Sequence, residues 1–205
     1  FVGAALYAMF LFLTYYFQVN LGYTPLEAGF AFLPFSLGII FAAGFVSQLL
    51  PRVGPRALIL PGLVMAIVGM LLLTQIDQDS SYWVLVFPAM VVMSVGLAGV
   101  FIPAASTSLI GVESHDAGVA SATLNTSQQI GGSLGTALLN TVFAGAVTAY
   151  FTDNPPTSPG QAEQILPQAF IHGYHVAFFW GAALFACALI AAIVPINAQK
   201  EDIPA

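Results

Sequence analysis

The feature that most constrains this chain is a series of six long apolar runs separated by short polar stretches. Each run is long enough to cross a hydrocarbon core of about 30 Å, which takes about 20 residues of α-helix. A soluble fold is excluded, because only 6% of the residues are charged and 59% are hydrophobic, against about 25% and about 45–50% in soluble domains. A β-barrel is excluded because the runs lack an alternating apolar period. The sequence therefore predicts transmembrane helices over residues 1–19, 25–50, 57–76, 82–109, 116–144 and 173–195.

These runs give the expected domain organisation. We predict an all-α membrane protein, with a six-helix bundle over residues 1–196 and a cytoplasmic tail over residues 197–205. Because the chain begins at Phe1, inside the first apolar run, we expect its natural N-terminus to lie upstream.

The few basic residues predict the orientation of the bundle. Arg52 and Arg56 follow the second predicted helix, and Lys200 follows the sixth. Six spans place all three on the same side of the membrane, and basic residues flanking spans favour the cytoplasm. We therefore expect a multi-pass protein of the cytoplasmic membrane with both ends of this piece in the cytoplasm.

A short repeat indicates internal symmetry. The second predicted helix begins with EAGFA (27–31) and the fifth with DAGVA (116–120). The two copies are three helices apart, so they cross the membrane in opposite directions. This arrangement is typical of two three-helix repeats with inverted topology. Thr24 and Glu27 also have the spacing of a helix-starting capping box.

The fifth predicted helix carries a polar stripe, because polar residues recur along it at steps of three and four. Two interpretations of the stripe stay open: its side chains bond across a helix pair, or they line a substrate path. Gly131 and Gly135, with Gly132 between them, favour close packing of another helix. The residues assigned to the substrate path or bundle interface are Asn125, Gln128, Gln129, Thr136 and Asn140.

Several kinds of chemistry are not indicated. The acidic residues fall in loops or at helix ends, so no titratable acid is expected at membrane depth in this piece. His172 and His175 form an H-x-x-H pair without further ligands, so a polar interfacial role is favoured and no metal site is predicted. No phosphate-binding loop, nucleophile elbow or catalytic triad is present in the sequence, so we do not expect an enzyme. The net charge is −6 and the acidic residues are spread thinly over loops and tails, so no nucleic-acid site is indicated.

Five stretches resemble one family when taken together and in order. They cover nearly the whole chain, and the fullest match is the stretch AGVASATLNTSQQIGGSLGTAL, which looks like the family's penultimate helix. The chain is similar to the 14-spanner drug:proton antiporter family of the major facilitator superfamily. The other stretches are YYFQVNLGYTPLEAGFAFLP (15–34), PRVGPR (51–56), GLAGVFIPAAS (96–106) and HGYHVAFFWGAALFACA (172–188).

The resemblance implies the last six of fourteen helices, that is, the C-terminal half of a secondary transporter. Its partners would be the lipid bilayer, its own N-terminal half and a small lipophilic or cationic substrate. The substrate would be exported by alternating access, with a proton gradient as the driving force and no cofactor. Because this piece lacks a buried acid, coupling acids are expected in the N-terminal half.

The resemblance also assigns individual positions. Arg52, Gly54 and Arg56 match a partial copy of the superfamily's inner-loop motif, and a positive-inside anchor is the favoured role of the two arginines. The first and fourth helices line the family's cavity, and Tyr7 and Phe10 of the first could stack there on a flat or cationic ligand.

The match departs from the family in two places. Many members carry arginine where this chain has Gln128, and the acidic residue of the fuller inner-loop motif is missing. Two alternatives to an exporter therefore remain. They are an importer or facilitator of the same superfamily and a non-transporting structural subunit of a membrane complex.

Overall fold

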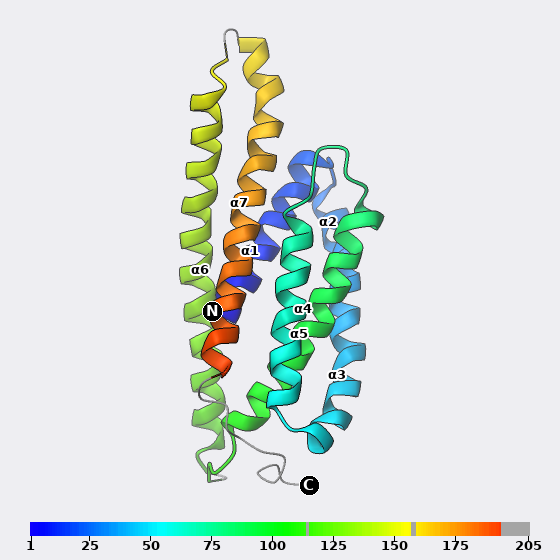
Figure 1. The fold of residues 1–205 in the computed structure, drawn as a ribbon, viewed down its shortest axis with the longest axis vertical. Coiled ribbons are helices and arrows are strands. Elements are labelled where there is room, and N and C mark those ends of the chain that lie inside the picture. The colour runs from blue at the N-terminus through cyan, green and yellow to red at the C-terminus, as the bar shows by residue number, and fades with distance from the viewer. Residues whose placement is uncertain (114, 157–158, 194–205) are drawn as a thin grey trace.

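The computed structural model describes residues 1–113, 115–156 and 159–193. Over these residues six helical segments are long and apolar enough to cross a membrane, which confirms the predicted fold class. The predicted tail, with Lys200, lies outside the described residues. The elements in Figure 1 are α1 (Val2–Tyr15), η1 (Tyr16–Asn20), α2 (Pro25–Ala31), α3 (Leu33–Val53), α4 (Arg56–Leu73), η2 (Tyr82–Val86), α5 (Phe87–Ser108), α6 (Ala117–Asp153) and α7 (Pro159–Ile193).

Three of the six spans are divided into two elements. The first ends and the fourth begins in short π-helical segments, η1 and η2. The second is divided at Phe32, just ahead of Pro34, which occupies the first turn of α3 where a proline costs no hydrogen bond. The start of this span is the predicted capping box: the Glu27 amide donates to Thr24 Oγ1, and the Thr24 amide donates to Glu27 Oε2 at 2.8 Å.

The packing of the helices follows the predicted inverted repeat. One repeat consists of α1, α2–α3 and α4, and the other of α5, α6 and α7. Helix α1 packs on α6, and its counterpart α5 packs on α3, while α4 packs on its own counterpart α7. Exchanging the two repeats therefore converts the α1–α6 contact into the α5–α3 contact and leaves the α4–α7 contact unchanged.

The core lies between α1, α4, α5 and α7. The rings of Phe12 and Phe178 meet edge to face at 6.2 Å between centroids, and those of Tyr16 and Tyr174 at 6.1 Å. Helices α4 and α5 touch through their backbones, because a Cβ added to Gly62 would lie 2.5 Å from the Gly96 carbonyl oxygen. The large rings that are fully buried are Phe12, Tyr16, Phe17, Tyr174, Phe178 and Phe185.

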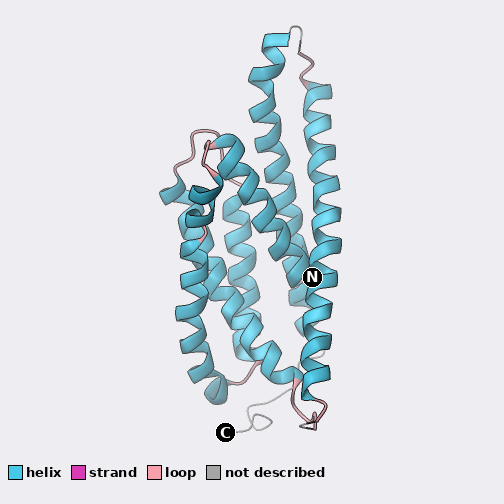
Figure 2. Ribbon diagram, turned by 180° about the vertical axis from the view of Figure 1, so that it is seen from behind, coloured by secondary structure: helices cyan, strands magenta, loops and turns pink. Residues whose placement is uncertain are grey.

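The last two helices extend beyond the predicted spans. Helix α6 continues to Asp153 rather than ending at 144, and α7 begins at Pro159 rather than at 173. With 37 residues α6 is about 55 Å long, well beyond the hydrocarbon core of about 30 Å. Figures 1 and 2 show the α6–α7 hairpin projecting past the other helices. We call this the hairpin end of the bundle, and the end that carries Arg52 and Arg56 the arginine end.

The sequence did not indicate these extensions, because the stretch TDNPPTSPGQAEQ is polar and rich in proline. Helix beyond the membrane needs no apolar residues, and Pro159 falls at the first residue of α7, where proline is tolerated.

Candidate functional site

The site is built on the contact between α1 and α6. A Cβ added to Gly3 would lie 2.7 Å from the Gln128 carbonyl oxygen, and one added to Gly135 would overlap Ala4. The two backbones therefore touch, since neither helix has room for a side chain at these positions. Of the predicted packing glycines, Gly131 is less close, with its nearest such atom 3.9 Å away at the Ala4 nitrogen. Figure 2 shows the N-terminus of the chain beside this long helix.

The Tyr7 side chain extends from α1 across the surface of α6. Its hydroxyl donates to Gln129 Oε1 at 2.9 Å. Its ring lies against Gly132, because a Cβ there would lie 2.6 Å from Tyr7 Cδ2. The ring therefore meets α6 at two points: its hydroxyl bonds the amide of Gln129, and its carbon atoms occupy the space that a side chain at position 132 would need.

An aromatic cavity of about 580 Å³ opens beside this tyrosine. Helices α1, α5 and α6 all contribute to its wall, and two amides of the predicted stripe, Asn125 and Gln128, belong to it. We call it the aromatic cavity; it is lined by Leu6, Tyr7, Phe10, Phe101, Ala105, Leu124, Asn125 and Gln128.

A second cavity of about 510 Å³ continues along the α1–α6 pair toward the hairpin end. The remaining stripe residues, Gln129, Thr136 and Asn140, line it on the α6 side. We call it the polar cavity; it is lined by Tyr7, Leu11, Tyr15, Gln129, Gly132, Ser133, Thr136, Ala137 and Asn140. The polar stripe is thus divided between two cavities, and Tyr7 lines both.

The chemistry that these cavities offer is hydrogen bonding and ring contact. Among the described residues that line them, none is acidic or basic. Phe10 lines the aromatic cavity, but its ring also packs on Phe32 at 5.0 Å and on Phe35 at 5.2 Å. Tyr7 is 42% exposed, so its ring has the larger free surface for a ligand.

The inner-loop motif forms the turn between α3 and α4. Gly54 ends α3 with φ of 81°, a conformation that favours glycine, and its amide donates to the Leu50 carbonyl oxygen at 3.0 Å. Arg52 lies in the last turn of α3, and Arg56 begins α4, both exposed. The motif therefore places two cationic side chains at one end of the bundle.

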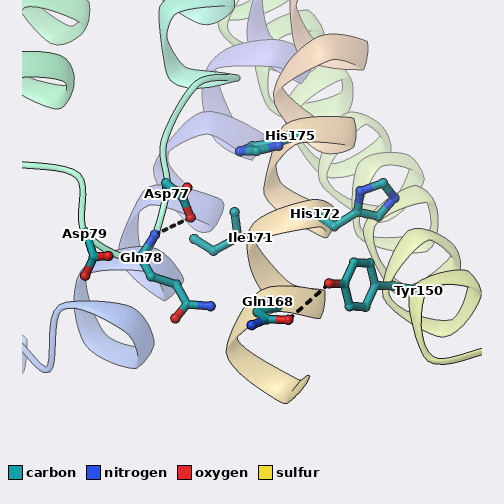
Figure 3. A pocket seen from close by; sticks show the side chains of 8 residues that line it. All are labelled: Asp77, Gln78, Asp79, Tyr150, Gln168, Ile171, His172 and His175. Atoms are coloured by element: carbon teal, nitrogen blue, oxygen red, sulfur yellow. Dashed lines mark hydrogen bonds between the residues drawn. The ribbon is translucent and has the colours of Figure 1, made fainter. Parts of the chain in front are cut away.

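The two histidines lie at the hairpin end, inside α7 rather than at its start. His172 and His175 line a hollow of about 430 Å³ together with Asp77 and Asp79 of the α4–η2 loop (Figure 3). His175 Nε2 hydrogen-bonds the Ile76 carbonyl oxygen. Within the described ranges no three His, Cys, Asp or Glu side chains gather closely enough to hold a metal ion.

This loop is anchored to the bundle from a second side, because the Tyr16 hydroxyl donates to the Asp77 carbonyl oxygen at 3.0 Å. The α4–η2 loop, which forms one side of the hollow, is thus held between η1 and α7. On the other side, Tyr150 and Gln168 are joined across the hairpin at 3.2 Å (Figure 3). The contacts of Tyr16 and His175 thus position the α4–η2 loop.

The resemblance assigned the fourth span, which contains α5, to the family's cavity, but the sequence did not identify the α5 residues that line the aromatic cavity. Phe101 and Ala105 are four residues apart and therefore share a helix face. Their apolar character does not distinguish a cavity wall from a packed interface, so no signal in the sequence alone identifies them. The polar periodicity of α6, in contrast, was visible.

Comparison with known proteins identifies the family. Residues 1–136 match the sequence profile of the Major Facilitator Superfamily. The chain belongs to this superfamily. It is 40% identical over 199 residues to the puromycin resistance protein pur8 of Streptomyces alboniger, a match that covers 96% of this chain and 39% of the relative.

Two other relatives carry similar descriptions. The multidrug resistance protein Stp of Mycobacterium tuberculosis is 34% identical over 71% of this chain and 27% of its own length. The cephamycin export protein CmcT of Amycolatopsis lactamdurans is 35% identical over 68% of this chain and 29% of its own length. These relatives agree with the resemblance to drug exporters. The chain spans only about two fifths of the puromycin resistance protein.

The superfamily match ends at Thr136. It therefore includes both sides of the α1–α6 contact, the whole aromatic cavity and the inner-loop motif. The protein is a multi-pass membrane protein of this superfamily.

Proposed function

We propose that this chain is the C-terminal half of a secondary transporter that exports small lipophilic or cationic molecules by alternating access. The observation that carries the proposal is the aromatic cavity, in which rings from α1 and α5 face amides from α6. Flat, lipophilic molecules with a few polar groups bind to walls of this kind. The names of the relatives, which include puromycin resistance and cephamycin export, support this substrate class.

A partner half belongs to the proposal, because alternating access requires a second bundle to close the cavity. The α2–α3 span and α6 are the least buried spans, with 17% of the most apolar stretch of each buried inside this chain. We infer that the N-terminal half and the lipid bilayer cover their apolar side chains. Exposed examples are Ile40, Phe41 and Phe45 on α3 and Ile130, Leu134 and Leu138 on α6.

The orientation follows from the two arginines of the inner-loop motif. Because basic residues that flank membrane spans favour the cytoplasm, the arginine end is assigned to the cytoplasm and the hairpin end to the outside. Both ends of this piece are then cytoplasmic, in the cell membrane. The driving force is assigned to the proton gradient, with the coupling acids in the N-terminal half, since the cavity linings described above carry none.

The cavity assignment is tested by replacing two wall amides in the full-length protein. With Asn125→Ala and Gln128→Ala together, the protein should lose hydrogen bonds worth about 1 kcal/mol each. We expect puromycin resistance to fall several-fold at equal expression. Thr148→Ala is the matched control, because Thr148 is an exposed residue of the same helix outside both cavities. Full resistance of the double variant would remove the substrate path from this cavity.

The importer and the structural subunit make different predictions in the same cells. An importer raises the cellular content of the drug above that of cells without the protein, whereas an exporter lowers it. A structural subunit leaves the cellular content of the drug unchanged. Measuring the puromycin content of cells with and without the protein distinguishes these functions.

A further inference from the structure

We propose that Tyr7 is a specificity-determining residue, whose ring forms a partition between the aromatic and polar cavities and limits the length of the substrate that fits. The inference rests on the proposed function, because it concerns which molecules the same site accepts. It goes further by assigning selection by size to one side chain and its two contacts on α6.

Tyr7 lies at the boundary between the two cavities. On α6 the aromatic cavity is lined by Leu124, Asn125 and Gln128, whereas the polar cavity begins at Gln129 and runs to Asn140. Tyr7 lines both cavities. Its hydrogen bond to Gln129 therefore lies where one cavity ends and the next begins.

Two contacts with α6 hold the Tyr7 side chain in this position. The hydroxyl bond to Gln129 fixes the tip of the ring, and Gly132 leaves the space in which the ring lies. Both contacts are on α6, and only one of them is a hydrogen bond. A single neutral hydrogen bond holds a side chain only moderately. The ring therefore separates the two cavities at rest, and breaking one hydrogen bond releases its tip.

Each cavity alone has the volume of a compact ligand. With the ring against α6, the spaces are about 580 and 510 Å³, each within the range for a compact drug-sized ligand. With the ring turned away, the two spaces would join into one longer groove beside α6. The closed partition thus favours compact substrates, and the open one admits elongated substrates.

The partition is tested by thiol labelling of the full-length protein with Cys187→Ser. Thr136→Cys, in the wall of the polar cavity, is modified by a bulky maleimide, and the rate is compared with and without Tyr7→Phe. Phenylalanine keeps the ring and loses the hydrogen bond, so we expect labelling about fivefold faster. Tyr150→Phe is the control, because it also loses a tyrosine hydrogen bond, the one to Gln168, and lies outside both cavities. An unchanged rate, or equal acceleration by the control, would overturn the partition.

A glycine pair gives a second test that leaves Tyr7 intact. Gly132→Ala would bring a Cβ to 2.6 Å from the Tyr7 ring, so the ring must leave α6 and labelling at Thr136→Cys should accelerate. Gly131→Ala meets nothing closer than 3.9 Å and should leave the rate unchanged. Equal rates in the two variants would contradict the role of Gly132.

The size selection is read from efflux. For a compact and an elongated substrate, Tyr7→Phe should change the ratio of the two efflux rates by about fivefold in favour of the elongated one. A loss of folded protein lowers both rates and leaves the ratio unchanged, and an unchanged ratio refutes the role in specificity. Labelling does not depend on transport, so a protein that exports nothing refutes the proposed function while labelling still decides the partition.

Discussion

Glycines of the same helix differ sharply in what surrounds them. Along α6, Gly132 meets the ring of Tyr7 and Gly135 meets Ala4, whereas nothing lies within 4 Å of a Cβ added to Gly145. The sequence shows the spacing of these glycines, and spacing alone favoured Gly131 with Gly135. Which glycine touches α1 depends on the angle at which the helices cross, and no local pattern encodes that angle.

Gly135→Ala should destabilise the full-length protein. The new methyl group overlaps Ala4, and forcing extra volume into such a contact costs roughly 1–3 kcal/mol. We expect a lower Tm in detergent, measured by thermal unfolding.

Gly145→Ala is the control for this substitution, because its Cβ enters open space on the same helix. Alanine is the better helix former by about 0.5–1 kcal/mol, so the Tm should stay or rise. Equal losses of Tm in the two variants would show that the α1–α6 contact is not as close as described.

At the scale of elements, the sequence predicts the existence of each span better than its ends. An apolar run marks the part of a helix that lies in lipid, and α6 and α7 continue where that signal stops. The capping box at Thr24 was predictable, because its residues are three apart in the chain and the cap is a local structure. The hairpin was missed because its polar composition fits a loop and a water-exposed helix equally well.

The projecting hairpin gives a topological prediction. In the Cys187→Ser background, Thr152→Cys should react with a membrane-impermeant thiol reagent added outside intact cells, because Thr152 is exposed near the tip of the hairpin. Ser108→Cys, exposed at the end of α5 on the arginine side, should react only after the membrane is opened. The reverse pattern would place the arginine end outside and overturn the assigned orientation.

At the scale of the whole molecule, six apolar runs and a repeated five-residue pattern predict a bundle of two inverted repeats, and the helix contacts agree with it. The polar stripe of α6 was also visible in the sequence. Its division between two cavities was not, because it depends on Tyr7 meeting Gln129 across 122 positions of the chain. Such a contact arises only when the whole bundle has packed.

The central claim is that the full-length protein uses this half-bundle to export drugs at the expense of the proton gradient. The most direct measurement loads cells with puromycin and follows its exit with and without a protonophore, beside cells that lack the protein. We predict that the drug leaves faster when the protein is present and that this difference disappears when the gradient is collapsed. Exit that is no faster with the protein at good expression, or that persists undiminished without the gradient, would contradict the account.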